Sequence, residues 1–134
     1  MQQVLINLIG NAIKFSNRSS NVIINLILDK YTSHSDVNTK ISIEVADEGI
    51  GMAREETANL FNPFFKSHSQ QSREKNPNGN GLGLSICHKI AKSLNGDLTC
   101  VSKVGLGTVF RFSFMAETSV EPEKHKKKIK KKNV

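Results

Sequence analysis

The sequence predicts a two-layer α+β sandwich, in which a mixed, mostly antiparallel sheet carries its helices on one face. Two segments have the apolar period of a helix, and the strand-like segments fall into two pairs, one on each side of the second helix. The length of 134 residues suits one ordinary domain and is too short for two. The chain has no apolar run long enough to span a membrane and does not begin like a signal peptide.

The first predicted helix covers residues 2–16 and is apolar around more than half of its circumference. The residues that cover this part of the circumference are Val4, Leu5, Leu8, Ile9, Ala12 and Phe15. A helix with so wide an apolar surface is expected to be buried. Four polar residues share one narrow stripe on it, namely Gln3, Asn7, Asn11 and Lys14. Because an unpaired buried polar group costs about 1–3 kcal/mol, either the protein or a ligand must supply partners for this stripe.

The next segments predict a β-hairpin. Residues 21–30 are rich in β-branched side chains, and residues 40–46 alternate apolar and polar side chains, so each is expected to be a strand. The polar residues 31–38 between them are expected to form the turn. The segment Asp47-Glu48-Gly49-Ile50-Gly51-Met52 follows at the end of the second strand.

A short helix is predicted at about residues 54–60, and it leads to the segment Phe61-Asn62-Pro63-Phe64-Phe65. Residues 66–80, which we call the lid segment, have almost no apolar side chain. A structureless loop of this length inside a compact domain is usually a functional lid or a disordered linker, and both interpretations are open at this point.

Residues 81–94 predict a second amphipathic helix, which Gly96 is expected to end. Its inward-facing residues are expected to be Leu84, Cys87, Ile90, Ala91 and Leu94. Residues 97–102 and 108–115 then predict a closing hairpin around Gly105-Leu106-Gly107.

The charge is concentrated at the C-terminal end. The chain has 19 Lys and Arg against 12 Asp and Glu, a net charge of +7, and residues 117–134 hold seven lysines and three glutamates of these. We therefore expect a folded domain over residues 1–116 and a disordered, Lys-rich tail over residues 117–134. A passive tail is one interpretation, and binding to nucleic acid or an anionic membrane, or nuclear targeting, is the other. Cys87 and Cys100 lack metal or redox spacing, so two reduced thiols in a cytoplasmic protein are expected.

Three glycine-rich turns occur in this small domain, over residues 49–51, 79–83 and 105–107. Glycine allows a ligand to approach the backbone closely, and the second turn opens a helix, where free N–H groups favour a phosphate. No parallel βαβ unit surrounds that turn, which excludes a dinucleotide-binding fingerprint. Asp47 directly precedes the first turn, either as a residue of a binding pocket or as an ordinary turn residue.

Together these segments resemble the catalytic, ATP-binding domain of two-component sensor histidine kinases, in the superfamily that also contains gyrase B, the MutL repair proteins and a major heat-shock chaperone. Residues 7–16 (Asn-Leu-Ile-Gly-Asn-Ala-Ile-Lys-Phe-Ser) look like the N box of that family. The family's other motifs are matched by the glycine segments at residues 47–52, 79–84 and 105–108 and by the F box at residues 61–65.

The resemblance implies ATP and Mg²⁺ as cofactors and assigns the site residues. Asn11 would bind the Mg²⁺ that bridges the ATP phosphates, with Asn7 and Lys14 beside it as catalytic residues, and Phe15 would border the nucleotide. Asp47 would accept a hydrogen bond from the adenine amine, whereas guanine would present a carbonyl oxygen there. The remaining nucleotide-binding residues would be Gly49, Ile50, Gly51, Met52 and Thr108 around the base, and Gly81, Leu82, Gly83 and Leu84 at the lid and phosphates.

One position separates two chemistries within the superfamily. Members that hydrolyse ATP have a glutamate one helical turn before the metal-binding asparagine, and Asn7 occupies that position here. An amide cannot accept a proton as a general base, which favours phosphotransfer over hydrolysis.

The resemblance thus implies a histidine protein kinase domain that transfers the γ-phosphate of ATP to a histidine on a separate phosphoacceptor domain, with a response regulator downstream. None of His34, His68, His88 and His125 has the sequence context of a phosphoacceptor, and each is expected to be an incidental surface residue. The chain begins at the N box, so we expect an N-terminally truncated domain that reaches a membrane only through a missing upstream region. The alternatives are an inactive nucleotide-binding regulatory module and, from another class, nucleic-acid binding through the tail, although no specific nucleic acid is expected.

Overall fold

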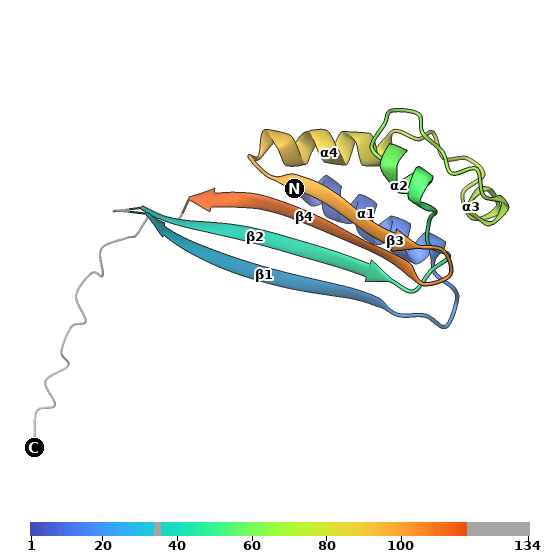
Figure 1. Cartoon of the computed structure of the whole chain (residues 1–134), viewed down its shortest axis with the longest axis horizontal. Helices are drawn as coiled ribbons and strands as arrows, with labels where there is room; N and C mark the ends of the chain where they lie inside the picture. The colour runs from blue at the N-terminus through green and yellow to red at the C-terminus, as the bar shows by residue number, and fades with distance from the viewer. Residues whose placement is uncertain (34–35, 118–134) are drawn as a thin grey trace, which may run out of the picture.

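The computed structural model describes residues 1–33 and 36–117, and its elements follow the predicted order. The helices are α1 (Gln2–Phe15), α2 (Arg54–Asn59), α3 (Gln70–Lys75) and α4 (Gly83–Ser93). The strands are β1 (Val22–Ser33), β2 (Asp36–Asp47), β3 (Asp97–Lys103) and β4 (Gly107–Glu117). Figure 1 shows α1 and α4 on one face of the sheet, which confirms the predicted two-layer α+β sandwich.

The sheet has the strand order β1-β2-β4-β3. Each hairpin contributes two strands, and the hairpins join where β2 pairs with β4. The sequence predicted a mixed, mostly antiparallel sheet, whereas all three pairings among the described strands are antiparallel. This order places the end of β2 next to the start of β4, which brings the first and third glycine-rich turns together.

The first hairpin is longer than predicted. The expected turn at residues 31–38 is wrong, because Tyr31 pairs with Asn38 and the ladder continues to Ser33 and Asp36. A β-hairpin ladder satisfies backbone hydrogen bonds whatever the polarity of its side chains, so a polar composition alone did not mark the turn. His34 lies outside the described residues, as do residues 118–134 of the predicted tail.

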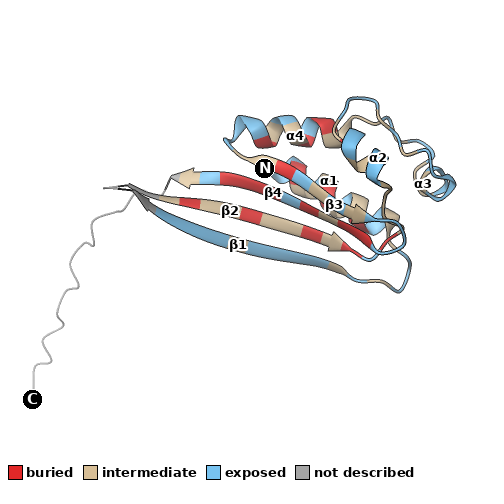
Figure 2. Ribbon diagram, viewed as in Figure 1, coloured by how far each residue is buried: buried red, intermediate tan, exposed pale blue. Residues whose placement is uncertain are grey.

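The core lies between the sheet and the helices. Its fully buried side chains include Val4 and Leu8 of α1, Cys87 of α4 and Phe112 of β4. The expectation that α1 is buried nearly all round is wrong, since Ile6 and Ile13 are 64% and 65% exposed. The covered side of α1 faces the sheet, α3 and α4, and Figure 2 shows that most of β1 is exposed.

The end of α4 differs from the prediction in one position. Leu94 is 37% exposed rather than inward-facing, because the helix has ended at Ser93. Asn95, with a φ of 51°, takes the left-handed conformation at the helix end. Gly96 follows it, and its N–H donates to the Ala91 carbonyl oxygen at 3.0 Å, so it helps to end the helix as predicted. Gly96 also lies against β4, where a Cβ atom would come within 1.8 Å of the Ser113 carbonyl oxygen.

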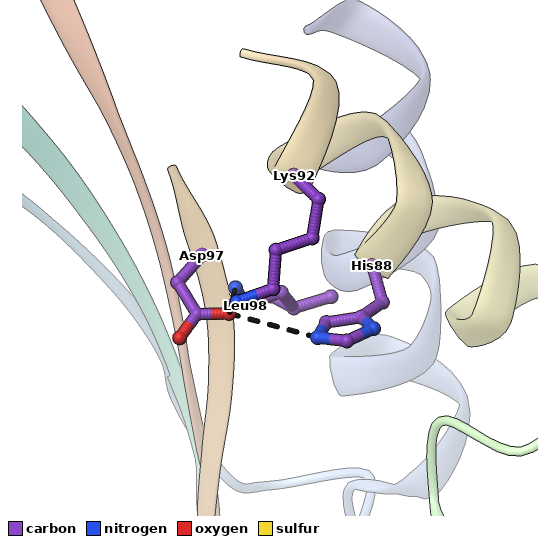
Figure 3. A network of polar contacts seen from close by, with 4 residues as sticks. All are labelled: His88, Lys92, Asp97 and Leu98. Atoms are coloured by element: carbon purple, nitrogen blue, oxygen red, sulfur yellow. Dashed lines mark hydrogen bonds and ion pairs between the residues drawn. The ribbon is translucent and has the colours of Figure 1, made fainter. Parts of the chain in front are cut away.

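A polar contact network joins α4 to β3 (Figure 3). The carboxylate of Asp97 lies 2.8 Å from Lys92 Nζ and 3.6 Å from His88 Nε2. The hydrogen bond from Lys92 is the main reason that the pKa of Asp97 is lowered. His88 also stacks on Phe61, with ring centroids 4.8 Å apart, so it is a packed residue rather than the incidental surface residue that was predicted.

The lid segment, residues 66–80, is not structureless as predicted, because it contains α3. Ser69 caps the N-terminus of this helix, and its hydroxyl oxygen accepts a hydrogen bond from the backbone N–H of Ser72. Such capping is a local signal that the overall polarity of the segment conceals. Within the described residues, no helix is long and apolar enough to span a membrane.

Candidate functional site

A cavity of about 710 Å³ lies between α1, the ends of β2 and β4, the lid segment and the start of α4. Its volume is within the roughly 300–1,000 Å³ that ligand pockets occupy. It is lined by most of the predicted site residues, namely Asn7, Asn11, Lys14, Phe15, Asp47, Ile50, Gly51, Met52, Gly81, Gly83, Leu84 and Thr108. The predicted residues Gly49 and Leu82 do not line it.

The cavity has two ends, which α1 connects. The sheet end is formed by Asp47, Ile50 and Thr108, next to the C-terminus of α1, where the N–H of Ile50 donates to the carbonyl of Phe15. The helix end is formed by Asn7, Asn11 and Gly83. Asn7 lies eight residues before Phe15, which is about 12 Å along a helix axis.

Asp47 is the last residue of β2 and only 8% exposed. Its Oδ1 accepts a hydrogen bond of 2.9 Å from the N–H of Gly49, so Asp47 forms the turn and lines the cavity at once. Burial raises the pKa of its carboxyl group, and hydrogen bonds from the backbone N–H groups of Gly49 and Thr108 partly offset this rise. The site therefore holds a carboxylate in a poorly solvated position, where a donor from a ligand gains more than it would in water.

Gly107 explains why the first and third glycine-rich turns lie together. Its φ is +102°, and a Cβ atom there would come within 1.9 Å of the Asp47 carbonyl oxygen. The two turns therefore pack backbone against backbone, and a hydrogen bond of 2.8 Å from the N–H of Gly105 to the carbonyl of Ile50 joins them. Gly49, although outside the cavity lining, holds the Asp47 carboxylate through its N–H.

Ser102 is a residue of this region that the motifs did not single out. It pairs with Thr108 across β3 and β4, and Thr108 pairs with Asp47 across β4 and β2, so the three form one row across the sheet. Its hydroxyl oxygen lies 2.9 Å from the Met52 nitrogen, the Gly107 carbonyl oxygen and Thr108 Oγ1. The predicted hairpin of residues 97–102 and 108–115 already places residue 102 opposite residue 108, and this was the available signal.

The helix end is arranged by contacts between α1 and α4. Asn11 Nδ2 donates to Asn7 Oδ1 at 3.2 Å, which leaves the amide oxygen of Asn11 as an acceptor. A Cβ atom at position 83 would come within 2.5 Å of Asn7 Nδ2, so the glycine allows α4 to begin directly against this side chain. The polar stripe on α1 is not buried as expected, because Gln3 and Lys14 are exposed and Asn7 and Asn11 are half-buried along the cavity.

The lid segment contacts α1 through two lysines. Lys14 Nζ donates to Asn76 Oδ1 at 3.2 Å, and Lys75 Nζ donates to the Ser16 carbonyl oxygen at 2.7 Å. Lys66 and Arg73 of the lid segment also line the cavity, and sequence reasoning did not single them out. Their signal was the presence of basic residues in a predicted lid over a predicted phosphate site.

The relatives found by sequence are histidine kinases much longer than this chain. The chain is 34% identical over 127 residues to the peroxide stress-activated histidine kinase mak2 of Schizosaccharomyces pombe. The matched region is 93% of this chain but only 5% of that protein. It is 35% identical over 123 residues to the autoinducer 2 sensor kinase/phosphatase LuxQ of Vibrio cholerae. That match spans 92% of this chain and 14% of LuxQ.

Solved structures share the fold. A crystal structure of full-length ShkA in complex with AMPPNP matches 88% of this chain and 22% of its own, with a TM-score of 0.61 and 26% identity. The structure of the mycobacterial sensor histidine kinase MprB matches 87% of this chain and 70% of its own, with a TM-score of 0.64. The identity is 21%, so this match shows the fold alone. The family described as histidine kinase-, DNA gyrase B- and HSP90-like ATPase matches residues 1–118, and the chain belongs to this family.

Proposed function

We propose that this domain binds ATP with Mg²⁺ in the cavity and presents the γ-phosphate to a histidine of a separate phosphoacceptor domain, in two-component signalling. The observation that carries the proposal is that one cavity combines the amide-and-lysine stripe of α1 with a buried carboxylate, Asp47, at its sheet end. Membership of the ATPase family, the AMPPNP in the ShkA crystal structure and the histidine kinase names of mak2 and LuxQ support it.

The sheet end suits the adenine base. Asp47 can accept a hydrogen bond from the exocyclic amine of adenine, while Ile50 and Met52 offer apolar contacts to the ring. Guanine would place a carbonyl oxygen against the carboxylate. A buried mismatch of this kind can lower the preference for the wrong nucleotide by about 10⁴-fold.

The helix end fits Mg²⁺ held together with phosphates. Mg²⁺ prefers oxygen ligands and is commonly held by one or two protein groups, waters and substrate phosphates. The amide oxygen of Asn11 is such a ligand, and no cluster of three or more His, Cys, Asp or Glu that could hold a metal occurs among residues 1–33 and 36–117. When bound, the ion neutralises phosphate charge, and Lys14 supplies a further positive charge on the same side of α1.

The cavity favours transfer over hydrolysis. Asp47 is the only acidic residue among the described lining residues, and it lies at the sheet end. Asn7 cannot act as a general base for water, so the protein contributes position and charge rather than proton abstraction. The change Asn7→Glu should therefore raise the slow ATP hydrolysis rate, measured at saturating nucleotide, by less than the about 10²–10⁴-fold typical of an evolved base.

Transfer is tested by mixing the chain with an isolated phosphoacceptor domain and ATP labelled at the γ-phosphate. The expected result is an acid-labile label on the acceptor histidine, which is lost with the Asn11→Ala variant. Tight nucleotide binding without any labelled acceptor, over several acceptor domains, would instead identify a nucleotide-binding regulatory module.

A further inference from the structure

We propose that Ser102 is a positioning residue that fixes the Thr108 hydroxyl as a hydrogen-bond acceptor toward the cavity, and thereby makes the sheet end select N–H donors. The inference rests on the proposed nucleotide function and assigns base selectivity to a residue that does not itself line the cavity. It follows from the three contacts that meet at the Ser102 hydroxyl.

The direction of each hydrogen bond is set by counting protons. The Met52 backbone N–H brings its own proton, so Ser102 Oγ accepts there at 2.9 Å. The Gly107 carbonyl oxygen, also at 2.9 Å, can only accept, so it must receive the single hydroxyl proton of Ser102. If that proton pointed elsewhere, two acceptor oxygens would face each other at hydrogen-bond distance without a hydrogen between them.

The third contact then has only one direction. Ser102 Oγ lies 2.9 Å from Thr108 Oγ1, and with the Ser102 proton already used, Thr108 must donate to Ser102. Thr108 is 7% exposed and lines the cavity, so its remaining hydrogen-bonding capacity there is that of an acceptor. Its neighbour across the sheet is Asp47, whose carboxylate is also an acceptor.

Two adjacent acceptors recognise a group with N–H donors, such as the exocyclic amine of adenine. A base with a carbonyl oxygen at the same position would meet acceptors only. The row Asp47–Thr108–Ser102 therefore selects the base in three ways. Asp47 accepts a hydrogen bond from it with a carboxylate, Thr108 accepts one with its hydroxyl, and Ser102 orients the Thr108 hydroxyl.

The test compares ADP with inosine diphosphate, in which a carbonyl replaces the amine. Calorimetric titration of the full chain gives the ratio of the two affinities. The Ser102→Ala variant frees the Thr108 proton to donate into the cavity, so the preference for ADP should fall by about three- to tenfold, the size of one neutral hydrogen bond. The Ser102→Thr variant keeps a hydroxyl and should retain the parent ratio within about twofold.

A loosened turn at Met52 would weaken the binding of both nucleotides alike and leave the ratio of their affinities unchanged. A change in that ratio therefore reports a change in base selectivity. An unchanged ratio in a folded Ser102→Ala variant overturns the proposal. If that variant does not fold, Thr108→Val removes the hydroxyl itself and should reduce the ADP preference to a similar degree, and an unchanged ratio there also overturns it. A parent chain that binds neither nucleotide would remove the proposed function, and this inference with it, whereas ADP binding with an unaltered ratio removes the role of Ser102 alone.

Discussion

The sheet end of the cavity and the lid segment are held by different kinds of contact. At the sheet end, Asp47 and Thr108 are at most 8% exposed, belong to paired strands and are fixed by backbone hydrogen bonds. The lid segment reaches α1 through the long side chains of Lys14 and Lys75. The Lys14 contact is exposed and the Lys75 contact is half-buried, and ordering two long side chains costs conformational entropy that offsets part of their gain. The difference indicates that the sheet end, where we propose that the base binds, is preorganised, whereas the lid segment over the proposed phosphate site can adjust when a ligand enters.

The largest effect is expected from a methyl group placed at the sheet end. Gly107→Ala adds a Cβ atom 1.9 Å from the Asp47 carbonyl oxygen at a φ of +102°. We expect the free energy of unfolding, measured in urea, to fall by about 3 kcal/mol or more. The matched control is Gly105→Ala, which has a φ of +77° but no atom within 4 Å of the new Cβ and should lose only about 1–2 kcal/mol. Equal losses of unfolding free energy in the two variants would show that the close backbone contact at Gly107 does not affect stability.

The next effect concerns binding rather than folding. Asp47→Asn should weaken ADP and ATP binding equally, by about 1–3 kcal/mol, because it replaces the charged acceptor of the proposed base contact. Its stability should not fall, since a carboxylate with a raised pKa is costly to keep charged in the folded protein. Asp97→Asn, on β3 outside the cavity lining, is the control and should leave ADP affinity unchanged in the same calorimetric titration.

The two aspartates should also respond to pH with opposite signs. Burial raises the pKa of Asp47 above 3.8, so between that value and the raised pKa the folded protein binds more protons than the unfolded one. The contribution of Asp47 to the free energy of unfolding therefore decreases as pH rises through this range. The pKa of Asp97 is lowered from 3.8, so its contribution is present above 3.8 and is lost as pH falls through the lowered value.

These signs are measured by comparing urea unfolding of the parent with Asp47→Asn and with Asp97→Asn across acidic pH. ADP affinity should also fall as Asp47 becomes protonated, at a higher pH than for an ordinary aspartate. Parallel pH profiles for the two variants would contradict the assigned burial of Asp47.

The smallest effect on stability is expected in the lid segment. Asn76→Ala removes the acceptor of Lys14, and the free energy of unfolding should change by no more than about 0.5 kcal/mol. Hydrogen exchange of residues 66–80 should become faster while that of the sheet is unchanged. Asn78→Ala, a lining residue of the same segment, is the control. In the parent, an ATP analogue with Mg²⁺ should slow exchange in this segment, and equally strong protection with and without it would mean packed structure rather than a lid.

The same contrast explains which features the sequence could predict. Elements with a clear period and a buried face, such as α1, α4 and the closing hairpin, were predicted to within a few residues, because burial imposes the period. The glycine turns predicted the region in which the cavity lies, and close backbone approach restricts such positions to glycine, as at Gly107. Membership of the kinase ATPase family follows from the order of these motifs.

The remaining features depend on strand pairing, on packing against neighbouring elements, or on a local capping signal that the composition of the segment conceals. The strands extend into the polar segment, β1 as far as Ser33 and β2 from Asp36, because pairing with a partner strand outweighs composition. Helix α3 depends on a cap at Ser69, and the exposure of Ile13 on α1 depends on which neighbours cover that helix. Ser102 was missed because it belongs to no motif of its own, and its hydroxyl joins Gly107 and Thr108 of the same hairpin to Met52, which is fifty residues away.

The most direct test of the central claim is calorimetric titration of an ATP analogue into the parent and the Asn11→Ala variant, with and without Mg²⁺. If the cavity holds a nucleotide with the metal at the helix end, Asn11→Ala should lose the metal-dependent part of the affinity. The weaker metal-free binding that the sheet end supports should remain. An Asn11→Ala variant that binds the Mg²⁺ complex as tightly as the parent would contradict the account, because Asn7 and Asn11 would then form only a structural hydrogen bond on α1.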